Sequence, residues 1–371
     1  MKEEMIALLN NLKKQAELID EYTPRFFRIY KTEDFFLFKS LLENTKGIFV
    51  YDEISSQLKE LVKSLNPSVR FSDQLYSEYV KKHLNGFSEY EYGVWVYYPW
   101  SNRLVHILDE EEYIQVRTNR NTYKITPEEK SILSTKKVGV IGLSVGQSVA
   151  LTMAMERSFE EIRLGDFDVI EVSNLNRIRT GIHNVNVKKT IVTAREISEI
   201  DPFLKVTCFH DGITNANLNS FIENGGQLDA IIEECDSLDI KINSRYAAKK
   251  YGIPVIMDTS DRGMIDIERF DLTPDRPIFH GLLSAFDLSE LNAQDTSKRM
   301  EMIYAILDMQ RISERFRSSI EEIGKSITTW PQLASGVVAG GANAADVYRR
   351  LMLGDNLSSG RYYVDIESII S

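Results

Sequence analysis

A glycine-marked turn at residues 142–146, with the sequence Gly-Leu-Ser-Val-Gly, is the first feature of this chain that could do chemistry. Such a turn between a strand and a helix lets backbone N–H groups approach a phosphate, and the helix behind it adds partial positive charge. An acid that binds a ribose hydroxyl is expected about 20 residues later, at the end of the next strand. Asp166 stands at that distance from Gly146, and Asp168 is the fallback. The spacing predicts a nucleotide site built on Gly142, Ser144 and Gly146.

The same turn also spells Gly-x-Ser-x-Gly, the nucleophile elbow of serine hydrolases, with Ser144 as the nucleophile. A hydrolase needs an acid and then a histidine after the serine, and Asp258 and His280 occur in that order. However, the elbow of a hydrolase usually follows several earlier strands of a long sheet. The turn in this chain follows the first strand of the region in which strands and helices alternate. The hydrolase also leaves Asp166 unexplained, so it is kept as a lesser alternative.

A polar segment, Ser-Asn-Leu-Asn-Arg at residues 173–177, follows the Asp-x-Asp of residues 166–168 within a few positions. This order of motifs, over residues 138–260, resembles the adenylation domain of the ubiquitin-activating-enzyme superfamily, of the ThiF/MoeB type. Residues 340–350 (Gly-Gly-Ala-Asn-Ala-Ala-Asp-Val-Tyr-Arg-Arg) add weaker support. The resemblance implies a domain that binds ATP.

The resemblance assigns roles to several positions around the turn. It implies that Asp166 holds the ribose and that Asn174 and Arg177 reach the ATP phosphates, where the forked donors of an arginine suit accumulating negative charge. The phosphate-binding lysine of the family stands at the start of the next helix. Lys189 fits that place best, and its neighbour Lys188 stays open.

Two more residues are implied by the resemblance. The magnesium-binding aspartate of the family ends a later strand, and Asp236 occupies that place; a hard cation prefers carboxylate oxygen and bridges phosphates. Family members also use an arginine upstream of the first strand, donated across a dimer interface, and Arg120 matches it. The expected catalytic residues are thus Asp236, Arg177, Lys189 and Arg120, the expected cofactors are ATP and Mg²⁺, and the expected assembly is a homodimer.

The cysteines depart from the family pattern. Only Cys208 and Cys235 are present, so the paired zinc-binding cysteines are missing and no structural zinc is expected. No well-placed cysteine follows Asp258, where many members form a thioester or persulfide. We therefore expect the chemistry to stop at adenylation, or the adenylate to pass to an acceptor held elsewhere.

The expected reaction is attack of a carboxylate on the α-phosphate of Mg-ATP, giving an acyl-adenylate and pyrophosphate. Positioning and cationic stabilisation of phosphate charge would carry the catalysis. The C-terminus of a peptide or of a ubiquitin-like protein is the expected substrate. An NAD- or FAD-linked oxidoreductase would use the same turn and Asp166, but would leave Arg177, Lys189 and Asp236 without a shared purpose. A catalytically silent scaffold subunit of the same superfamily is the other alternative.

The elements that must position these residues alternate along the chain. Strand-like runs at residues 137–141, 161–165, 205–209, 230–234 and 254–258 are separated by helical stretches. Alternation of this kind predicts an α/β, Rossmann-like fold, a mainly parallel sheet with helices on both faces. The nucleotide domain is expected at residues 126–371, with a helical insertion at about 285–329. Residues 1–125, rich in Tyr and Phe, are expected to form a smaller α+β module for substrate or partner recognition.

Charge and hydropathy limit the partners. A net charge of −11 argues against nucleic acid and against membrane surfaces, which need a basic footprint. No apolar run is long enough for a membrane-spanning helix, and the first residues lack the features of a secretory signal. A cytoplasmic location is therefore expected.

Overall fold

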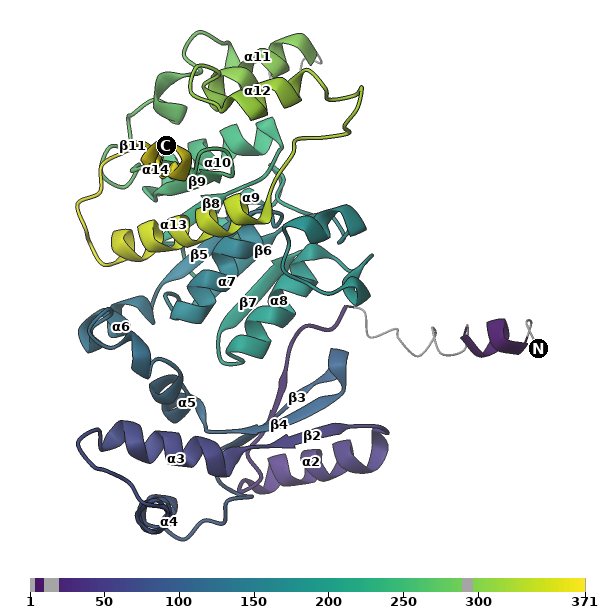
Figure 1. The fold of residues 1–371 in the computed structure, drawn as a ribbon, viewed down its shortest axis with the longest axis vertical. Helices are drawn as coiled ribbons and strands as arrows, with labels where there is room; N and C mark the ends of the chain where they lie inside the picture. Colours follow the sequence, from purple (N-terminus) through teal and green to yellow (C-terminus); the bar gives the residue numbers. More distant parts are fainter. Residues whose placement is uncertain (1–3, 10–19, 289–295, 371) are drawn as a thin grey trace. The chain divides into compact units, whose positions relative to one another are not determined.

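The computed structural model describes residues 4–9, 20–288 and 296–370. The chain forms two compact units (Figure 1): residues 1–127 with 198–203, and residues 128–197 with 204–371. Part of the expected helical insertion, residues 289–295, lies outside the described residues. The nucleotide motifs all belong to the second unit.

The second unit is built on a seven-stranded sheet. Its strands are β5 (Lys137–Ile141), β6 (Glu161–Gly165), β7 (Lys205–Phe209), β8 (Ala230–Glu233), β9 (Val255–Thr259), β10 (Met264–Glu268) and β11 (Gly360–Tyr363). Their order is β11-β10-β9-β8-β5-β6-β7. The five strands from β9 to β7 are parallel, and β10 and β11 add two antiparallel strands at one edge. The predicted Rossmann-like, mainly parallel sheet is confirmed; β10 was not predicted.

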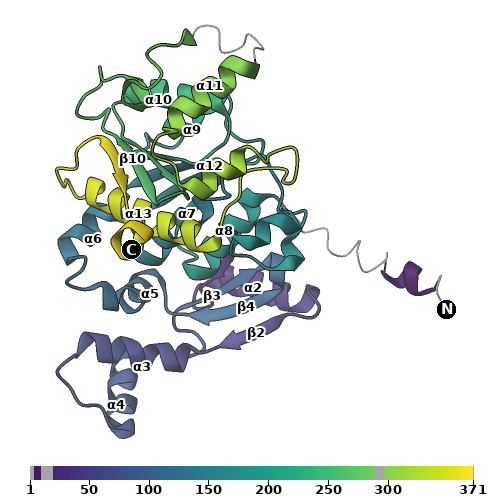
Figure 2. The same ribbon diagram turned by 45° about the horizontal axis from the view of Figure 1, so that its top comes forward.

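Helices cover both faces of this sheet (Figures 1 and 2). The helices that follow β5 to β8 are α7 (Gly146–Glu156), α8 (Lys189–Ile200), α9 (Leu218–Glu223) and α10 (Leu238–Tyr251). Right-handed crossovers place α7 and α8 on one face and α9 and α10 on the other, because the strand order reverses after β7. The point of reversal lies at the carboxyl ends of β5 and β8, where α/β sheets bind ligands.

The small-residue segment near the C-terminus forms helix α13 (Ala334–Met352), which packs on α7 and β9. A Cβ on Gly341 would lie 2.3 Å from Ser148 Oγ, and one on Gly340 would lie 1.9 Å from Asp258 Oδ2. These two glycines therefore allow the helix to approach its neighbours closely. Helices α11 (Thr296–Leu307) and α12 (Glu314–Ile320) precede α13.

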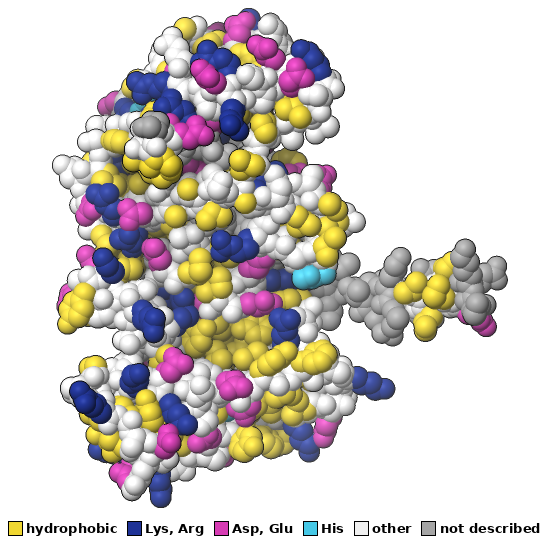
Figure 3. Space-filling view, viewed as in Figure 1, with side chains coloured by type: hydrophobic (Ala, Val, Ile, Leu, Met, Phe, Trp, Pro, Cys, Tyr) yellow, Lys and Arg dark blue, Asp and Glu magenta, His cyan; other side chains and the backbone are white. Residues whose placement is uncertain are grey.

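The first unit contains a four-stranded sheet. Its strands are β1 (Arg25–Phe27), β2 (Phe49–Asp52), β3 (Val94–Tyr98) and β4 (Arg103–Ile107), in the order β1-β3-β4-β2. Its helices are α2 (Thr32–Asn44), α3 (Ile54–Leu65), α4 (Asp73–Leu84) and α5 (Glu110–Arg117), and the short helix α6 (Pro127–Leu133) follows. Strand β2 is an edge strand whose four residues are all exposed, and α2 has no buried residue. Hydrophobic side chains consequently remain on the surface of this unit (Figure 3).

None of the described helices is both long enough and apolar enough to cross a membrane.

Candidate functional site

The glycine turn joins β5 to α7 at the carboxyl edge of the sheet. Gly142 has φ +88°, and a Cβ there would lie 2.7 Å from the backbone of Glu234, so this conformation and this contact both require glycine. A Cβ on Gly146 would lie 2.7 Å from Val140 Cγ1, which explains the second glycine. The turn is thereby pressed against the end of β8, with the N-terminus of α7 directly behind it.

Asp166 follows β6 and is bound to the turn. Its Oδ2 accepts a hydrogen bond from the backbone N–H of Leu143 (2.7 Å), and its Oδ1 accepts one from the N–H of Asp168 (2.8 Å). Burial raises the pKa of Asp166, and the charge of Lys189 opposes that rise. The side chain is 7% exposed, so it braces the turn from the β6 side. Asp168 remains exposed.

The two candidate lysines at the start of α8 have different environments. Lys189 Nζ donates to Asp168 Oδ2 (2.8 Å) and to Ser144 Oγ (3.3 Å), and it lies 4.0 Å from Asp166 Oδ2. Lys188 Nζ instead donates to the backbone carbonyl of Phe167 (2.7 Å). Only Lys189 thus joins the turn to both aspartates.

The Ser-Asn-Leu-Asn-Arg segment contains a short 3-10 helix, Val172–Asn176. Asn174 is 7% exposed, and its Oδ1 accepts a hydrogen bond from the N–H of Glu171 (3.1 Å). Arg177 donates through Nη1 to Asn176 Oδ1 (2.9 Å), while its buried Nε has no hydrogen-bond partner among the described residues. Burial lowers the pKa of Arg177, and Asp236 and Glu171 act against this. A partly desolvated guanidinium with a free donor can bind an added anion.

These groups surround a cavity of about 540 Å³. Its lining includes Ser144, Asp168, Asn174, Arg177, Lys189 and Asp236, together with residues 328–332. Gly142, Gly146 and Asp166 lie behind this lining and shape the turn. Arg120 is exposed in the first unit and is not part of the lining.

Residues 328–332 (Thr-Thr-Trp-Pro-Gln) were missed in the sequence analysis. They precede α13 and line the cavity opposite the turn, where Asn176 Nδ2 donates to the carbonyl of Gln332 (2.8 Å). The pair Trp330-Pro331 could have drawn attention to this segment, because tryptophan is rare in this chain and a proline interrupts a helix. This segment ties the helical insertion to the Ser-Asn-Leu-Asn-Arg motif.

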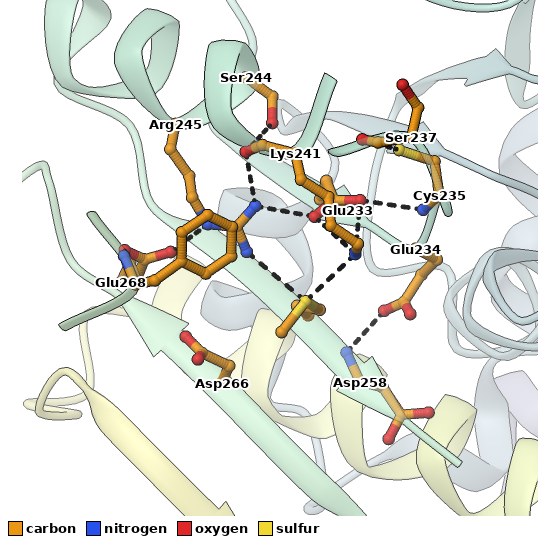
Figure 4. A network of polar contacts seen from close by, with 12 residues as sticks. Glu233, Glu234, Cys235, Ser237, Lys241, Ser244, Arg245, Asp258, Asp266 and Glu268 are labelled. Carbon is orange, nitrogen blue, oxygen red and sulfur yellow. Dashed lines mark hydrogen bonds and ion pairs between the residues drawn. The ribbon is translucent and has the colours of Figure 1, made fainter. Parts of the chain in front are cut away.

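Asp236 is exposed at the cavity, just beyond β8. The strand end is fixed by buried ion pairs (Figure 4): Glu233 accepts from Arg245 Nη1 (2.7 Å) and from Lys241 Nζ (3.1 Å to each oxygen). Burial alone would raise the pKa of Glu233, but the charges of Lys241 and Arg245 hold it below its ordinary value. Arg245 also pairs with Glu268 of β10. Asp236 is therefore presented from a rigid strand end.

The arrangement suits binding of phosphates with one divalent cation. Arg177 and Lys189 line one cavity together with Ser144 of the turn, and its lining also holds the carboxylates of Asp168, Glu171 and Asp236. Within the described ranges, no three His, Cys, Asp or Glu side chains converge as a metal-binding group. A magnesium ion bound here would take one protein carboxylate and complete its coordination with phosphate and water oxygens, as Mg²⁺ commonly does.

The serine hydrolase requires a histidine beside Ser144. His280 Nε2 lies 2.9 Å from Asp266 Oδ1, and its Nδ1 lies 2.7 Å from Arg276 Nη2. It is not among the cavity residues, and Ser144 Oγ is engaged by Lys189. The structure does not assemble the residues of the hydrolase triad.

Comparisons with known proteins agree with the motif order. A model of the ThiF family matches residues 117–342. The uncharacterized protein MT1398 of Mycobacterium tuberculosis is 43% identical over 276 residues, which are 74% of this chain and 38% of that protein. tRNA threonylcarbamoyladenosine dehydratase 2 of Saccharomyces cerevisiae is 26% identical over 148 residues, 40% of this chain and 33% of that protein.

The chain thus spans well under half the length of these two relatives. Among solved structures, a crystal structure of E. coli MccB with MccA-N7isoASN has a TM-score of 0.49 and 15% identity, covering 85% of each chain.

Proposed function

The chain belongs to the ThiF family, and we propose that it is an ATP-dependent adenylyltransferase that activates a carboxylate as an acyl-adenylate. The observation that carries this proposal is the convergence of the glycine turn, Arg177, Lys189 and Asp236 on one cavity at the carboxyl edge of the sheet. Neither a nicotinamide nor a flavin enzyme gives these three charged residues a common purpose. A nucleoside triphosphate does, because its phosphates need both cations and a metal-binding carboxylate.

In the proposed reaction, a carboxylate oxygen of the substrate forms a bond to the α-phosphorus of ATP. The bond from that phosphorus to the oxygen bridging the α- and β-phosphates breaks, and the electron pair leaves with pyrophosphate. No proton has to move, because the nucleophile is already ionised. The chain therefore needs no general base, and its task is to position the reactants and to stabilise developing phosphate charge.

Each site residue has a part in this step. Lys189 and Arg177 would donate hydrogen bonds to the triphosphate. To do so, Lys189 would give up its hydrogen bond to Asp168. The N–H groups behind Gly142 would face a phosphate, and Asp166 would hold the ribose while keeping the turn in place. Asp236 would hold magnesium, which when bound neutralises phosphate charge.

For the substrate, we propose the C-terminal carboxylate of a peptide or of a ubiquitin-like protein. A carboxylate borne by tRNA is a second candidate, because one relative is named as a tRNA threonylcarbamoyladenosine dehydratase. The net charge of −11 favours the peptide, since tRNA binding needs a basic surface. The first unit, with its exposed edge strand, is proposed to recognise this partner, and Arg120 is proposed to act across a homodimer interface.

The test is magnesium-dependent exchange of labelled pyrophosphate into ATP, with candidate peptides, small carrier proteins and tRNA as separate arms. Exchange that requires a carboxylate substrate is expected, and Asp236→Ala should lower it by at least about a hundredfold. Asp239→Ala is the matched control, because Asp239 lies three residues after Asp236, in the first turn of α10, but pairs with Arg299 (2.8 Å) outside the cavity.

The alternatives predict other outcomes. Measurable ATP binding without exchange in any arm would indicate a silent scaffold. Binding of NAD or FAD without binding of ATP would indicate the oxidoreductase and would overturn the proposal.

A further inference from the structure

A second cavity, of about 180 Å³, lies at the carboxyl ends of β8 and β9. Its walls are mostly apolar and come from α10, α11, α12 and the strands β9 to β11. The apolar residues that line it include Leu238, Met257, Met264, Ile303, Ile306, Leu307, Ile312, Phe316 and Tyr363. None of the nucleotide motifs accounts for such a cavity.

The second cavity adjoins the first. Four residues line both: Asp236 and the three consecutive residues Trp330, Pro331 and Gln332. The ring of Trp330 stacks on that of Phe316, with centroids 5.7 Å apart and planes 30° apart, so helix α12 supports this shared wall. A ligand whose reacting atom lies beside Asp236 therefore has the apolar cavity next to it.

The strand order decides which part of the reactants can enter. Asp166, which is proposed to hold the ribose, directly follows β6, whereas the second cavity lies at β8 and β9. Strands β6, β5, β8 and β9 are consecutive in the sheet, and adjacent strands lie about 4.8 Å apart, so β6 and β9 are separated by about 14 Å. The base and ribose of ATP would therefore lie near β6, on the side of the turn away from the second cavity. The cavity lies beyond Asp236, on the side left for the carboxylate substrate.

Part of the polar lining of the cavity is already engaged within the protein. Lys241 is bound by Glu233 (3.1 Å), and Asp261 accepts hydrogen bonds from the N–H and Oγ of Ser313 (2.9 and 2.6 Å). The carboxylate of Asp258 also lines the cavity; it packs against Gly340 of α13, and neither of its oxygens has a hydrogen-bond partner among the described residues. The rest of the wall is mostly apolar and suits an apolar side chain of a ligand.

We propose that this cavity receives the side chain next to the reacting carboxylate, so that the substrate ends in a bulky apolar residue such as leucine. This inference rests on the proposed adenylation and narrows its substrate class. A ubiquitin-like tail that ends in glycine would leave the cavity empty and would gain none of the burial of its walls. The terminal side chain would then decide both binding and the position of the carboxylate at the α-phosphate.

The experiment compares N-acetyl-Ala-Ala-Leu with N-acetyl-Ala-Ala-Gly in pyrophosphate exchange, using the full chain with saturating Mg-ATP. The leucine peptide should have a KM at least about tenfold lower, because a buried aliphatic side chain discriminates by that much or more. Calorimetric titration of both peptides, in the presence of a non-hydrolysable ATP analogue, should give the same ratio of Kd values.

Two substitutions on α11 test whether the preference for the leucine peptide comes from the cavity or from a general effect on the enzyme. Ile303 and Leu307 are four residues apart on one helix face and both line the cavity. Ile303→Trp should remove most of the preference for leucine and leave the KM for ATP unchanged, while Tyr304→Trp, outside the lining, should do neither. Leu307→Ala enlarges the cavity and should shift the preference from the leucine peptide towards N-acetyl-Ala-Ala-Phe. This variant provides the test if Ile303→Trp fails to fold.

The outcomes distinguish the two proposals. Exchange with equal KM values for the leucine and glycine peptides would overturn the cavity assignment and leave adenylation intact. Bound nucleotide without exchange for any peptide, carrier protein or tRNA would overturn adenylation, and with it the substrate class inferred here.

Discussion

The buried carboxyl group of Asp258 and the partly buried one of Glu234 lie near the carboxyl ends of β9 and β8. Asp258 is 4% exposed, and neither of its carboxylate oxygens has a hydrogen-bond partner among the described residues, while its backbone N–H donates to Glu234 Oε1 (2.8 Å; Figure 4). Burial raises the pKa of Asp258 to about 7. Burial, and next the charge of Asp258, raise the pKa of Glu234 as well. Folding therefore favours the protonated form of this pair.

This pair predicts a loss of stability with rising pH. A carboxyl whose folded pKa lies above its unfolded value stabilises the fold fully below the unfolded value, near 4, and loses that contribution as pH rises through about 7. Asp258→Asn cannot ionise, so we expect it to be more stable than the parent chain at pH 8 by on the order of 2 kcal/mol. The difference should shrink at pH 5. Urea unfolding at both pH values measures it.

The exposed carboxylate of Asp236 provides the control for that measurement. Asp236→Asn makes the same substitution at an exposed carboxylate and is unfolded in urea at the same two pH values. If Asp258→Asn and the parent chain respond to pH identically, the pair does not hold the proton.

Single residues also show what the sequence could predict. Asp166 was predicted from its spacing to the turn, and Asn174, Arg177 and Lys189 from the family resemblance. The structure places the last three in the lining of one cavity and Asp166 against the turn behind it. The choice between Lys189 and Lys188 needed coordinates, since adjacent helix residues point in different directions. The Trp330 wall was missed because it lies far along the chain from the motifs it covers.

At the scale of elements, helix α2 and strand β2 leave apolar surface uncovered. Phe36 and Leu37 of α2 are 63% and 61% exposed, and Phe49 and Val50 of β2 are 63% and 55% exposed. Among the described strands, β2 pairs only with β4 and forms an edge of the sheet. An exposed apolar edge strand is a place where an extended segment of a partner can add a strand.

If the first unit recognises the substrate through this edge, Phe49→Asp should weaken it. We expect KM for a long peptide or carrier protein to rise by about tenfold or more, with KM for ATP and for the three-residue probes unchanged. Tyr90→Asp is the control, because Tyr90 is 69% exposed in the same unit but outside β2. Equal effects of the two substitutions, or no effect of either, would show that β2 is not the recognition edge.

The elements themselves were largely readable from the sequence. The parallel strands were predicted because each is a short apolar run followed by a helix with its own end signals. The family resemblance read from the motifs is confirmed by the match over residues 117–342. Strand β10 was missed, although Met264–Glu268 alternates apolar and acidic residues as strands with one exposed face do. Its acids are instead buried in ion pairs with Arg245 and Arg361. Burial of paired charges cannot be read from a local pattern.

At the scale of the whole molecule, the two units are not contiguous segments. Residues 198–203, at the end of α8, belong to the first unit, where buried Asp201 pairs with Arg117 (2.8 Å). This pairing joins residues far apart in the chain, which no sequence pattern marks. A cut after residue 125 would remove Arg117 and leave residues 198–203 without the unit to which they belong, so deleting the module is not a clean test of its role.

The proposed homodimer can be tested without removing any part of the chain. Arg120→Ala and Asp236→Ala should each be inactive alone if both residues serve the site. When the two variants are mixed and allowed to exchange subunits, half of the dimers are mixed ones. If Arg120 acts across the interface, each mixed dimer holds one complete site, made from Asp236 of one subunit and Arg120 of the other.

We therefore expect pyrophosphate exchange to return to roughly a quarter of the parental activity in the equilibrated mixture. Arg120 acting within its own subunit gives no recovery, because every site then lacks one of the two residues. Sedimentation of the mixture checks that dimers are present. Dimers without recovered exchange would place Arg120 in its own subunit's site or outside the chemistry, whereas recovery requires that two chains complete one site.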